Sequence, residues 1–282
     1  MWIWLAVGSA LMLGVYDVAK KQSLKRNSSL SVLLLATAFS TLFLSPWLSP
    51  GPVENHLRLV LKAILVSLSW IAGMEGLKRL PITIAGTIKA SRPVFVLLLS
   101  LLIFGEKLNA AQWAGSIIAI FALYILSVSG KREGIKFTRN AGVAWMAVSV
   151  AAGVASALYD KRVMGLMDPL FVQSWCNLYI TALLALTMLV SWLRDKEKFQ
   201  PLRWDWNILL IAVFITTADA LYFFSLKDPD ALLSVISMIR RSSVIVTFVG
   251  GAILFKETNL RSKSLALAVL LAGMALIVFG SV

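Results

Sequence analysis

Long apolar runs alternate with short polar connections along the whole chain. Each of ten runs can form one membrane-spanning helix, because about twenty helical residues cross a hydrocarbon core about 30 Å thick. The runs are residues 2–19, 30–48, 57–77, 81–104, 110–129, 141–160, 170–193, 206–226, 231–255 and 262–280. No connection between them is long enough for a soluble domain. The pattern predicts an all-α membrane protein with ten transmembrane helices.

Composition supports this prediction. The chain is 59% hydrophobic and 15% charged, whereas soluble domains carry about 25% charged residues. The first apolar run has no positive region before it, which favours a first span over a cleaved signal peptide. The only cysteine, Cys176, lies in an apolar run, and the only histidine, His56, lies in a connection. Neither residue belongs to a metal-binding set, so no metal and no cofactor are expected.

The net charge of +13 raises the question of a nucleic-acid partner. The basic residues lie in short connections rather than on one face or in one tail, so no nucleic-acid partner is expected. Counted with the flanks of the spans, the connections after odd-numbered spans hold seventeen lysines and arginines, and those after even-numbered spans hold six. The positive-inside rule then places the odd-span connections in the cytoplasm and both termini outside. The expected location is the cytoplasmic membrane, with the lipid bilayer as a partner.

The two halves of the chain resemble each other. Residues 7–17 align with residues 150–160 and share a Tyr-Asp pair, while residues 82–130 align without gaps with residues 233–281. In the second alignment Lys89 falls on Arg240. Because five spans is an odd number, the halves must have opposite orientations. We therefore predict two inverted five-helix repeats, 1–130 and 141–282, with 131–140 as a cytoplasmic linker; secondary transporters commonly have this plan.

The run GEKLNAAQWAGSIIAIFALYIL (105–126) resembles the end of an EamA-type half in the drug/metabolite transporter superfamily. In that family a Gly-Glu closes the fourth helix, and a glutamine and small residues follow in the fifth. The fitting residues are Glu106, Gln112, Gly115 and Ala122, then Glu257 and Gly273 in the second half, where Lys263 and Ala266 replace the glutamine and a glycine. The resemblance implies a transporter whose central cavity is lined mainly by helices 1, 3, 4, 6, 8 and 9. It leaves the substrate open among amino acids, nucleotide-sugars, drugs and phosphorylated metabolites.

Four cations lie deep in the fourth and ninth predicted spans: Lys89, Arg92, Arg240 and Arg241. A charge at that depth costs several kcal/mol, so it serves a function or has a partner. A spacing of three predicts one helix face for Lys89 and Arg92, and arginine suits carboxylate or phosphate. The pattern favours an anion site between the two spans. The alternative is internal ion pairing, chiefly with Asp219. The run IRRSSVIV (239–246) is also similar to the ninth-helix Lys-Arg stretch of plastid triose-phosphate translocators, which bind organic phosphates.

Three aspartates are candidates for proton coupling: Asp17 and Asp160, which are equivalent in the repeat, and the deeper Asp219. A carboxylate with a raised pKa can titrate during transport. The alternatives are pairing of Asp17 and Asp160 with Lys20, Lys21, Lys161 or Arg162, and a static bridge from Asp219 to Arg240 or Arg241. Tyr16, Tyr159 and Tyr222 adjoin these acids, and they either bind substrate in the cavity or pack.

The sequence therefore predicts a secondary transporter, and not an enzyme, that moves a small anionic metabolite by alternating access. The expected partners are an organic phosphate or carboxylate and, if the aspartates titrate, protons. A Walker-type phosphate loop is absent from the sequence, which argues against ATP-driven transport by this chain. The first alternative is an exporter of amino acids or drugs, with the cations in structural ion pairs. The second is a membrane enzyme or a channel, which the lack of a histidine or acid cluster and the inverted repeat disfavour.

Overall fold

A computed structural model describes residues 2–104, 109–131, 134–163, 166–194, 203–226 and 239–280. These residues form helices and connections, with no strand among them, so the all-α prediction is confirmed. The first half contains α1 (Trp2–Ser23), α2 (Ser29–Leu44), the turn η1 (Ser45–Trp47), α3 (Val53–Arg79), α4 (Ile82–Ala90), α5 (Arg92–Phe104) and α6 (Ala110–Lys131). The second half contains the turn η2 (Phe137–Arg139), α7 (Ala141–Val163), α8 (Pro169–Arg194), α9 (Trp206–Leu226), α11 (Ser243–Ile253) and α12 (Leu260–Phe279).

Seven helices in the described part of the chain are long and apolar enough to cross a membrane by themselves: α1, α2 with η1, α3, α6, α7, α8 and α12. They correspond to seven of the ten predicted spans. The predicted fourth span is divided into α4 and α5, and the beginning of the ninth lies outside the described residues. The eighth corresponds to α9, in which Trp206–Tyr222 is a shorter apolar helix. A multi-pass membrane protein is therefore supported, and the number ten stays a prediction.

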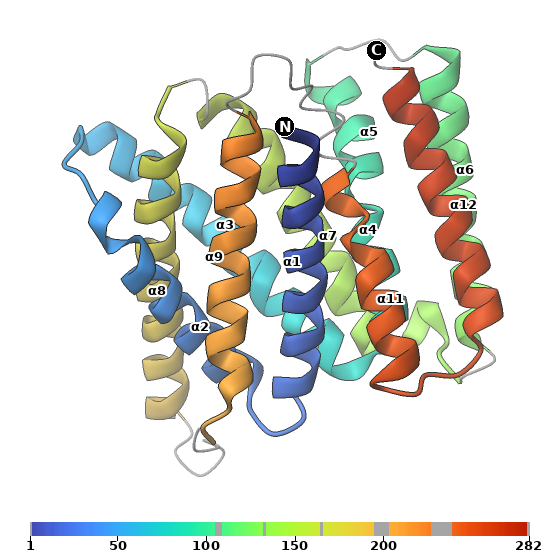
Figure 1. The fold of residues 1–282 in the computed structure, drawn as a ribbon, viewed down its shortest axis with the longest axis horizontal. Coiled ribbons are helices and arrows are strands. Elements are labelled where there is room, and N and C mark those ends of the chain that lie inside the picture. Colours follow the sequence, from blue (N-terminus) through green and yellow to red (C-terminus); the bar gives the residue numbers. More distant parts are fainter. Residues whose placement is uncertain are drawn as a thin grey trace.

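The helices pack in pairs that draw one member from each half of the chain. Pairs of this kind include α6 with α12, α3 with α7, α1 with α9, α2 with α8 and α4 with α11. Figure 1 shows α6 and α12 together at one side of the molecule, with α2 and α8 at the opposite side. If each predicted span is replaced by its counterpart in the other half, the pairs of spans to which these helices belong stay the same, as expected for two repeats related by a twofold axis. The inversion of the repeats is not tested by this pattern and stays a prediction.

The ends of α1 and α12 fit the predicted arrangement of the termini. Figure 1 shows the start of α1 and the end of α12 at the same end of the bundle. The outer surface of the bundle is apolar: on α6, for example, Ile117 and Tyr124 are 62% and 64% exposed. Helices can present such a surface to lipid because their backbone polar groups bond internally. Which end faces the cytoplasm stays a prediction.

Three residues of the family-like motif have structural roles. Asn109 and Gln112 cap the start of α6 reciprocally, each backbone N–H donating to the other side chain. Gly115 lets α6 approach α12, because a Cβ there would lie 2.5 Å from the backbone oxygen of Gly273. Glu257 accepts hydrogen bonds from the backbone N–H groups of Ile82 and Thr83 at the start of α4. Its repeat counterpart, Glu106, lies outside the described residues.

Candidate functional site

A cavity of about 810 Å³ lies between the two halves. Its walls come from α1, α3, α4, α5, α7, α9, α11 and residues 240 and 241, which agrees with the lining helices that the family resemblance implies. The structure adds α8, the predicted seventh span, and Leu33 of α2 to this set. Among the described lining residues the cations outnumber the carboxylates: Lys20, Lys62, Lys89, Arg92, Arg240 and Arg241 against Asp17 and Asp219. The cavity is therefore a place where an anion would be favoured.

Two serines interrupt the helices that carry the deep cations. The Oγ of Ser91 donates to the carbonyl of Ile88 at 2.6 Å, and the Oγ of Ser242 donates to the carbonyl of Ile239 at the same distance. Ser91 and Ser242 are aligned in the repeat, so both halves break at one position. Such hydroxyl bonds to the preceding turn compete with the helix and bend it. Interrupted helices at corresponding positions of two repeats are typical of transporter binding sites.

The break at Ser91 corrects the prediction that Lys89 and Arg92 share one helix face. Lys89 lies in the last turn of α4, whereas Arg92 begins α5. Both line the cavity, but their side chains bind different partners. The sequence prediction has an uninterrupted helix over each of the spans 81–104 and 231–255 and does not include these breaks.

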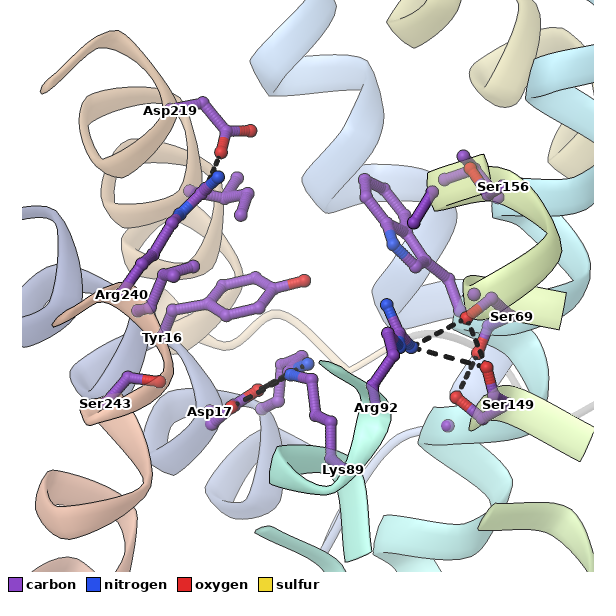
Figure 2. A pocket seen from close by; sticks show the side chains of 18 of the residues that line it. Tyr16, Asp17, Ser69, Lys89, Arg92, Ser149, Ser156, Asp219, Arg240 and Ser243 are labelled. Carbon is purple, nitrogen blue, oxygen red and sulfur yellow. Dashed lines mark hydrogen bonds and ion pairs between the residues drawn. The ribbon is translucent and has the colours of Figure 1, made fainter. Parts of the chain in front are cut away.

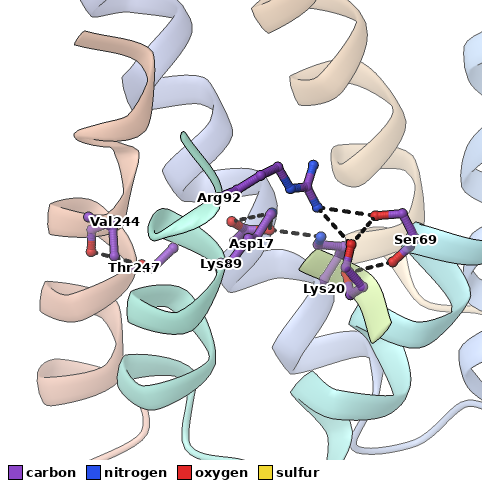
Figure 3. A network of polar contacts seen from close by, with 8 residues as sticks. Asp17, Lys20, Ser69, Lys89, Arg92, Val244 and Thr247 are labelled. Atoms are coloured by element: carbon purple, nitrogen blue, oxygen red, sulfur yellow. Dashed lines mark hydrogen bonds and ion pairs between the residues drawn. The ribbon is translucent and has the colours of Figure 1, made fainter. Parts of the chain in front are cut away.

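Lys89 is paired with Asp17 of α1. Its Nζ lies 2.9 Å from both carboxylate oxygens, and the Nζ of Lys20 lies 2.7 Å from Oδ1 of the same aspartate (Figure 3). The Nζ of Lys20 also lies 4.0 Å from the centre of the Tyr16 ring. The predicted local pairing of Asp17 with Lys20 is therefore present. The pairing with Lys89, 72 residues away, was not predicted, because no local pattern reveals a contact between two distant spans.

Arg240 forms an ion pair with Asp219 of α9, as the pairing alternative predicted. Its guanidinium carbon lies 4.3 Å from the centre of the Tyr222 ring, so the pair is covered on one side by an aromatic face. Figure 2 shows this pair on the opposite side of the cavity from Arg92. Asp219 is therefore engaged in a bridge in this conformation.

Arg92 binds neutral groups at the junction of α3 and α7. Its Nη2 donates to Ser69 Oγ at 3.1 Å and to the carbonyl oxygen of Ser149 at 3.3 Å (Figure 2). The two serines also bind each other, since each hydroxyl donates to the other residue's carbonyl, at 2.8 and 2.7 Å. The guanidinium lies against Gly153, where a Cβ would fall 2.1 Å from Cζ. No carboxylate in the described part of the chain forms an ion pair with Arg92.

Arg241 lines the same cavity, and the charges of Arg92 and Arg240 act on it. Within the described residues it has no hydrogen bond or ion pair. Two of the four deep cations are thus neutralised by aspartates, and two, Arg92 and Arg241, are not. Like charges near each other in a partly desolvated cavity repel, and an anion placed between them would relieve this repulsion.

The remaining predicted site residues are distributed as follows. Tyr16 and Tyr222 line the cavity. Tyr159 does not: it packs beside Leu59, Val163 and Val172, and its hydroxyl donates to the carbonyl of Arg58 at 3.3 Å. In this structure Tyr159 therefore has the packing role that the sequence left open, because its face of α7 turns toward the start of α3. The side chain of Asp160 lies outside the described part of the structure.

Several polar lining residues were missed by sequence reasoning. They are Ser69, Ser149, Ser156, Gln173 and Asn177. Serine, glutamine and asparagine in single apolar spans carry no charge, so they give little signal without the neighbouring helices. The described residues include no group of three or more His, Cys, Asp or Glu side chains arranged to hold a metal ion.

Comparison with known proteins places the chain among transporters. The sequence profile described as the EamA-like transporter family matches residues 1–128 and 140–279. An uncharacterized transporter from Archaeoglobus fulgidus is 24% identical over 273 residues, which cover 90% of each chain. A crystal structure of a protein with 16% sequence identity has a similar fold, with a TM-score of 0.60 over 96% of this chain and 95% of that one.

Proposed function

Because the chain belongs to the EamA-like transporter family, we propose that it is a secondary transporter for a small anionic metabolite. The substrate would be an organic phosphate or a carboxylate, carried across the cytoplasmic membrane by alternating access. The observation that carries this proposal is the pair of arginines, Arg92 and Arg241, which line the cavity without a carboxylate partner among the described residues. Both can present two parallel N–H donors to such a group.

Lys89 and Arg240 complete the proposed site as paired cations. Each holds one aspartate in this conformation, and an arriving anion would compete with that aspartate for the cation. Tyr16 and Tyr222 lie beside these pairs and would contribute an aromatic wall. The proposed substrate-binding set is therefore Lys89, Arg92, Arg240, Arg241, Tyr16 and Tyr222.

The proposed site is tested by charge-removing variants of the two arginines. Purified protein is screened by thermal shift against an anion library, and the best ligands are assayed for uptake into proteoliposomes. We expect Arg92→Gln and Arg241→Gln each to weaken binding about tenfold or more, as for loss of a charge-assisted bond. We expect smaller losses in Lys89→Ala and Arg240→Ala, whose charges are already shared with aspartates.

Arg139→Gln is the matched control, because Arg139 is exposed in η2 and away from the cavity. Binding and uptake unchanged in all four cavity variants would refute the anion site. Preferential binding of zwitterionic or neutral ligands would favour the alternative, an exporter of amino acids or drugs in which the cations serve in ion pairs. The bridges of Asp17 and Asp219 are the observation that supports this alternative.

Proton coupling through Asp17, Asp160 or Asp219 is a separate hypothesis. Its support is that Asp17 and Asp219 each bridge helices that line the cavity, so protonation would free a cation for the substrate. We expect an imposed pH gradient to drive uptake in the wild-type protein and to lose this effect in Asp219→Asn. Uptake that is insensitive to the gradient would identify an exchanger instead.

The proposed orientation has both termini outside and the linker 131–140 in the cytoplasm, with halves 1–130 and 141–282 as inverted repeats. The distribution of basic residues supports it. A reporter that is active only in the cytoplasm, fused to the C-terminus, is expected to be silent. An active fusion would place the C-terminus in the cytoplasm and contradict the proposed orientation.

A further inference from the structure

Gln173 on α8 is a buried amide in the cavity wall. Its Oε1 and Nε2 are both shielded from solvent, and neither has a hydrogen-bond partner among the described residues. A side-chain amide can accept two hydrogen bonds and donate two. Buried polar atoms in native proteins are nearly always satisfied, so an unpartnered pair of this kind needs an explanation. Because Gln173 lines the cavity, a rotation of its side chain into the cavity would let a ligand group supply the missing partners.

Asn177 lies one helical turn beyond Gln173 and also lines the cavity. Residues four apart share one helix face, so the two amides form one polar strip on α8. The rest of this face is largely apolar, with Val172, Cys176 and Ile180 beside the strip. The strip carries hydrogen-bond donors and acceptors but no net charge.

The strip lies on a different helix from the four deep cations Lys89, Arg92, Arg240 and Arg241. α8 packs on α2 and α3, whereas the proposed anion-binding residues come from α4, α5 and residues 240 and 241. A cavity of about 810 Å³ has the size of sites for whole metabolites rather than for a single phosphate or carboxylate. A ligand filling it would therefore meet charge at one end and neutral polar groups at the other.

We propose that Gln173 and Asn177 form a neutral hydrogen-bonding subsite that recognises hydroxyl or amide groups at the uncharged end of the substrate. This inference rests on the proposed function for the anionic end. It narrows the substrate class from small anions in general to polyhydroxy or amide-bearing phosphates and carboxylates. Anions with a plain hydrocarbon tail would bind less well, because they would leave the Gln173 amide without partners.

The test uses pairs of probes that share one anionic group and differ in hydroxyls. Glycerol 3-phosphate is compared with propyl phosphate, and gluconate with hexanoate, by calorimetry on the full-length protein. We expect the wild-type protein to bind the hydroxylated member of at least one pair about tenfold more tightly. Gln173→Leu is expected to reduce that preference to about threefold or less, with affinity for the hydrocarbon member unchanged. Asn177→Leu is a second variant, and it too is expected to reduce the preference for the hydroxylated probe.

Thermal stability separates recognition from a structural role. An unpartnered buried amide contributes nothing to the fold, so Gln173→Leu is expected to melt at the wild-type temperature or above. Gln22→Leu, at an exposed position near the end of α1, is the matched control and should change neither stability nor preference. A destabilised Gln173→Leu that keeps the wild-type preference would overturn the subsite.

The two proposals can fail separately. If the anions bind but the preference is absent, or is equal in wild type and both α8 variants, the subsite is wrong and the anion site stands. If uncharged glycerol binds, loses affinity in Gln173→Leu, and no anion binds, the subsite stands and the proposed anionic substrate is wrong.

Discussion

Replacing Gly153 by alanine is expected to abolish most transport without unfolding the protein. The added Cβ would lie 2.1 Å from Cζ, 2.4 Å from Nη2 and 2.6 Å from Nε of Arg92. These atoms form the far end of a flexible side chain, so Arg92 can move away while the helices keep their positions. Its guanidinium would then lose its place on Ser69 and Ser149. We expect kcat/KM for the best anion to fall about tenfold or more, in line with loss of a charge-assisted contact.

The loss of transport in Gly153→Ala should not be accompanied by a loss of stability. Alanine favours a helix over glycine by about 0.5–1 kcal/mol, so the melting temperature of Gly153→Ala should equal or exceed that of the wild type. Gly8→Ala in α1 is the matched control, because its Cβ would meet only Leu221 Cδ1, at 3.3 Å. It should transport normally. Wild-type transport in Gly153→Ala would show that the position of Arg92 does not matter to the site.

Replacing Asp17 by asparagine is expected to destabilise the protein strongly. The carboxylate accepts from Lys89 at 2.9 Å and from Lys20 at 2.7 Å, and its side chain is 13% exposed. Without it, the buried ammonium group of Lys20 and the partly exposed one of Lys89 would lose their negative partner. Removing one member of a buried ion pair typically costs about 3–5 kcal/mol. We expect a clear fall in the melting temperature of the detergent-solubilised protein, together with loss of transport.

A second substitution distinguishes loss of the ion pair from other damage. Asp17→Asn with Lys89→Met removes one of the stranded charges, so it should recover part of the stability but not transport. Glu54→Gln is the control, because Glu54 pairs with Arg58 at the exposed start of α3, where an ion pair is worth about 1 kcal/mol or less. Equal stability of Asp17→Asn and wild type would mean that the lysines find other partners.

The helical fold was predictable because it depends on a signal present in every span. Apolar runs of about twenty residues report the bilayer thickness directly, and the described helices follow them. The interruption of the fourth span had a local signal that was overlooked: Pro93 lacks an N–H and disfavours helical backbone at Arg92. The interruption at Ser242 has no such signal, since Val244 stands where the repeat has Pro93. It could be inferred only from the alignment of the halves.

The candidate site was predictable in its charges but not in its pairing. Lys89, Arg92, Arg240 and Arg241 stand out because deep cations are rare in membrane spans. Which of them are neutralised depends on helix packing, which brings Asp17 to Lys89 and Ser69 to Arg92. The neutral amides of α8 had neither charge nor repeat symmetry to mark them. Their place in the cavity wall is visible only because the structure shows which face of α8 points inward.

The mutual hydrogen bonds of Ser69 and Ser149 have a mechanical consequence. They join α3 of the first half to α7 of the second, and Arg92 binds both partners of this junction. An anion held by Arg92 is therefore connected to both halves through one short chain of bonds. A shift of the halves that broke this junction would change the affinity of Arg92 for the proposed anion, and by thermodynamic reciprocity the bound anion would bias that shift. Ligand affinity and the preference for one conformation would then both depend on the same hydrogen bonds between Ser69, Ser149 and Arg92.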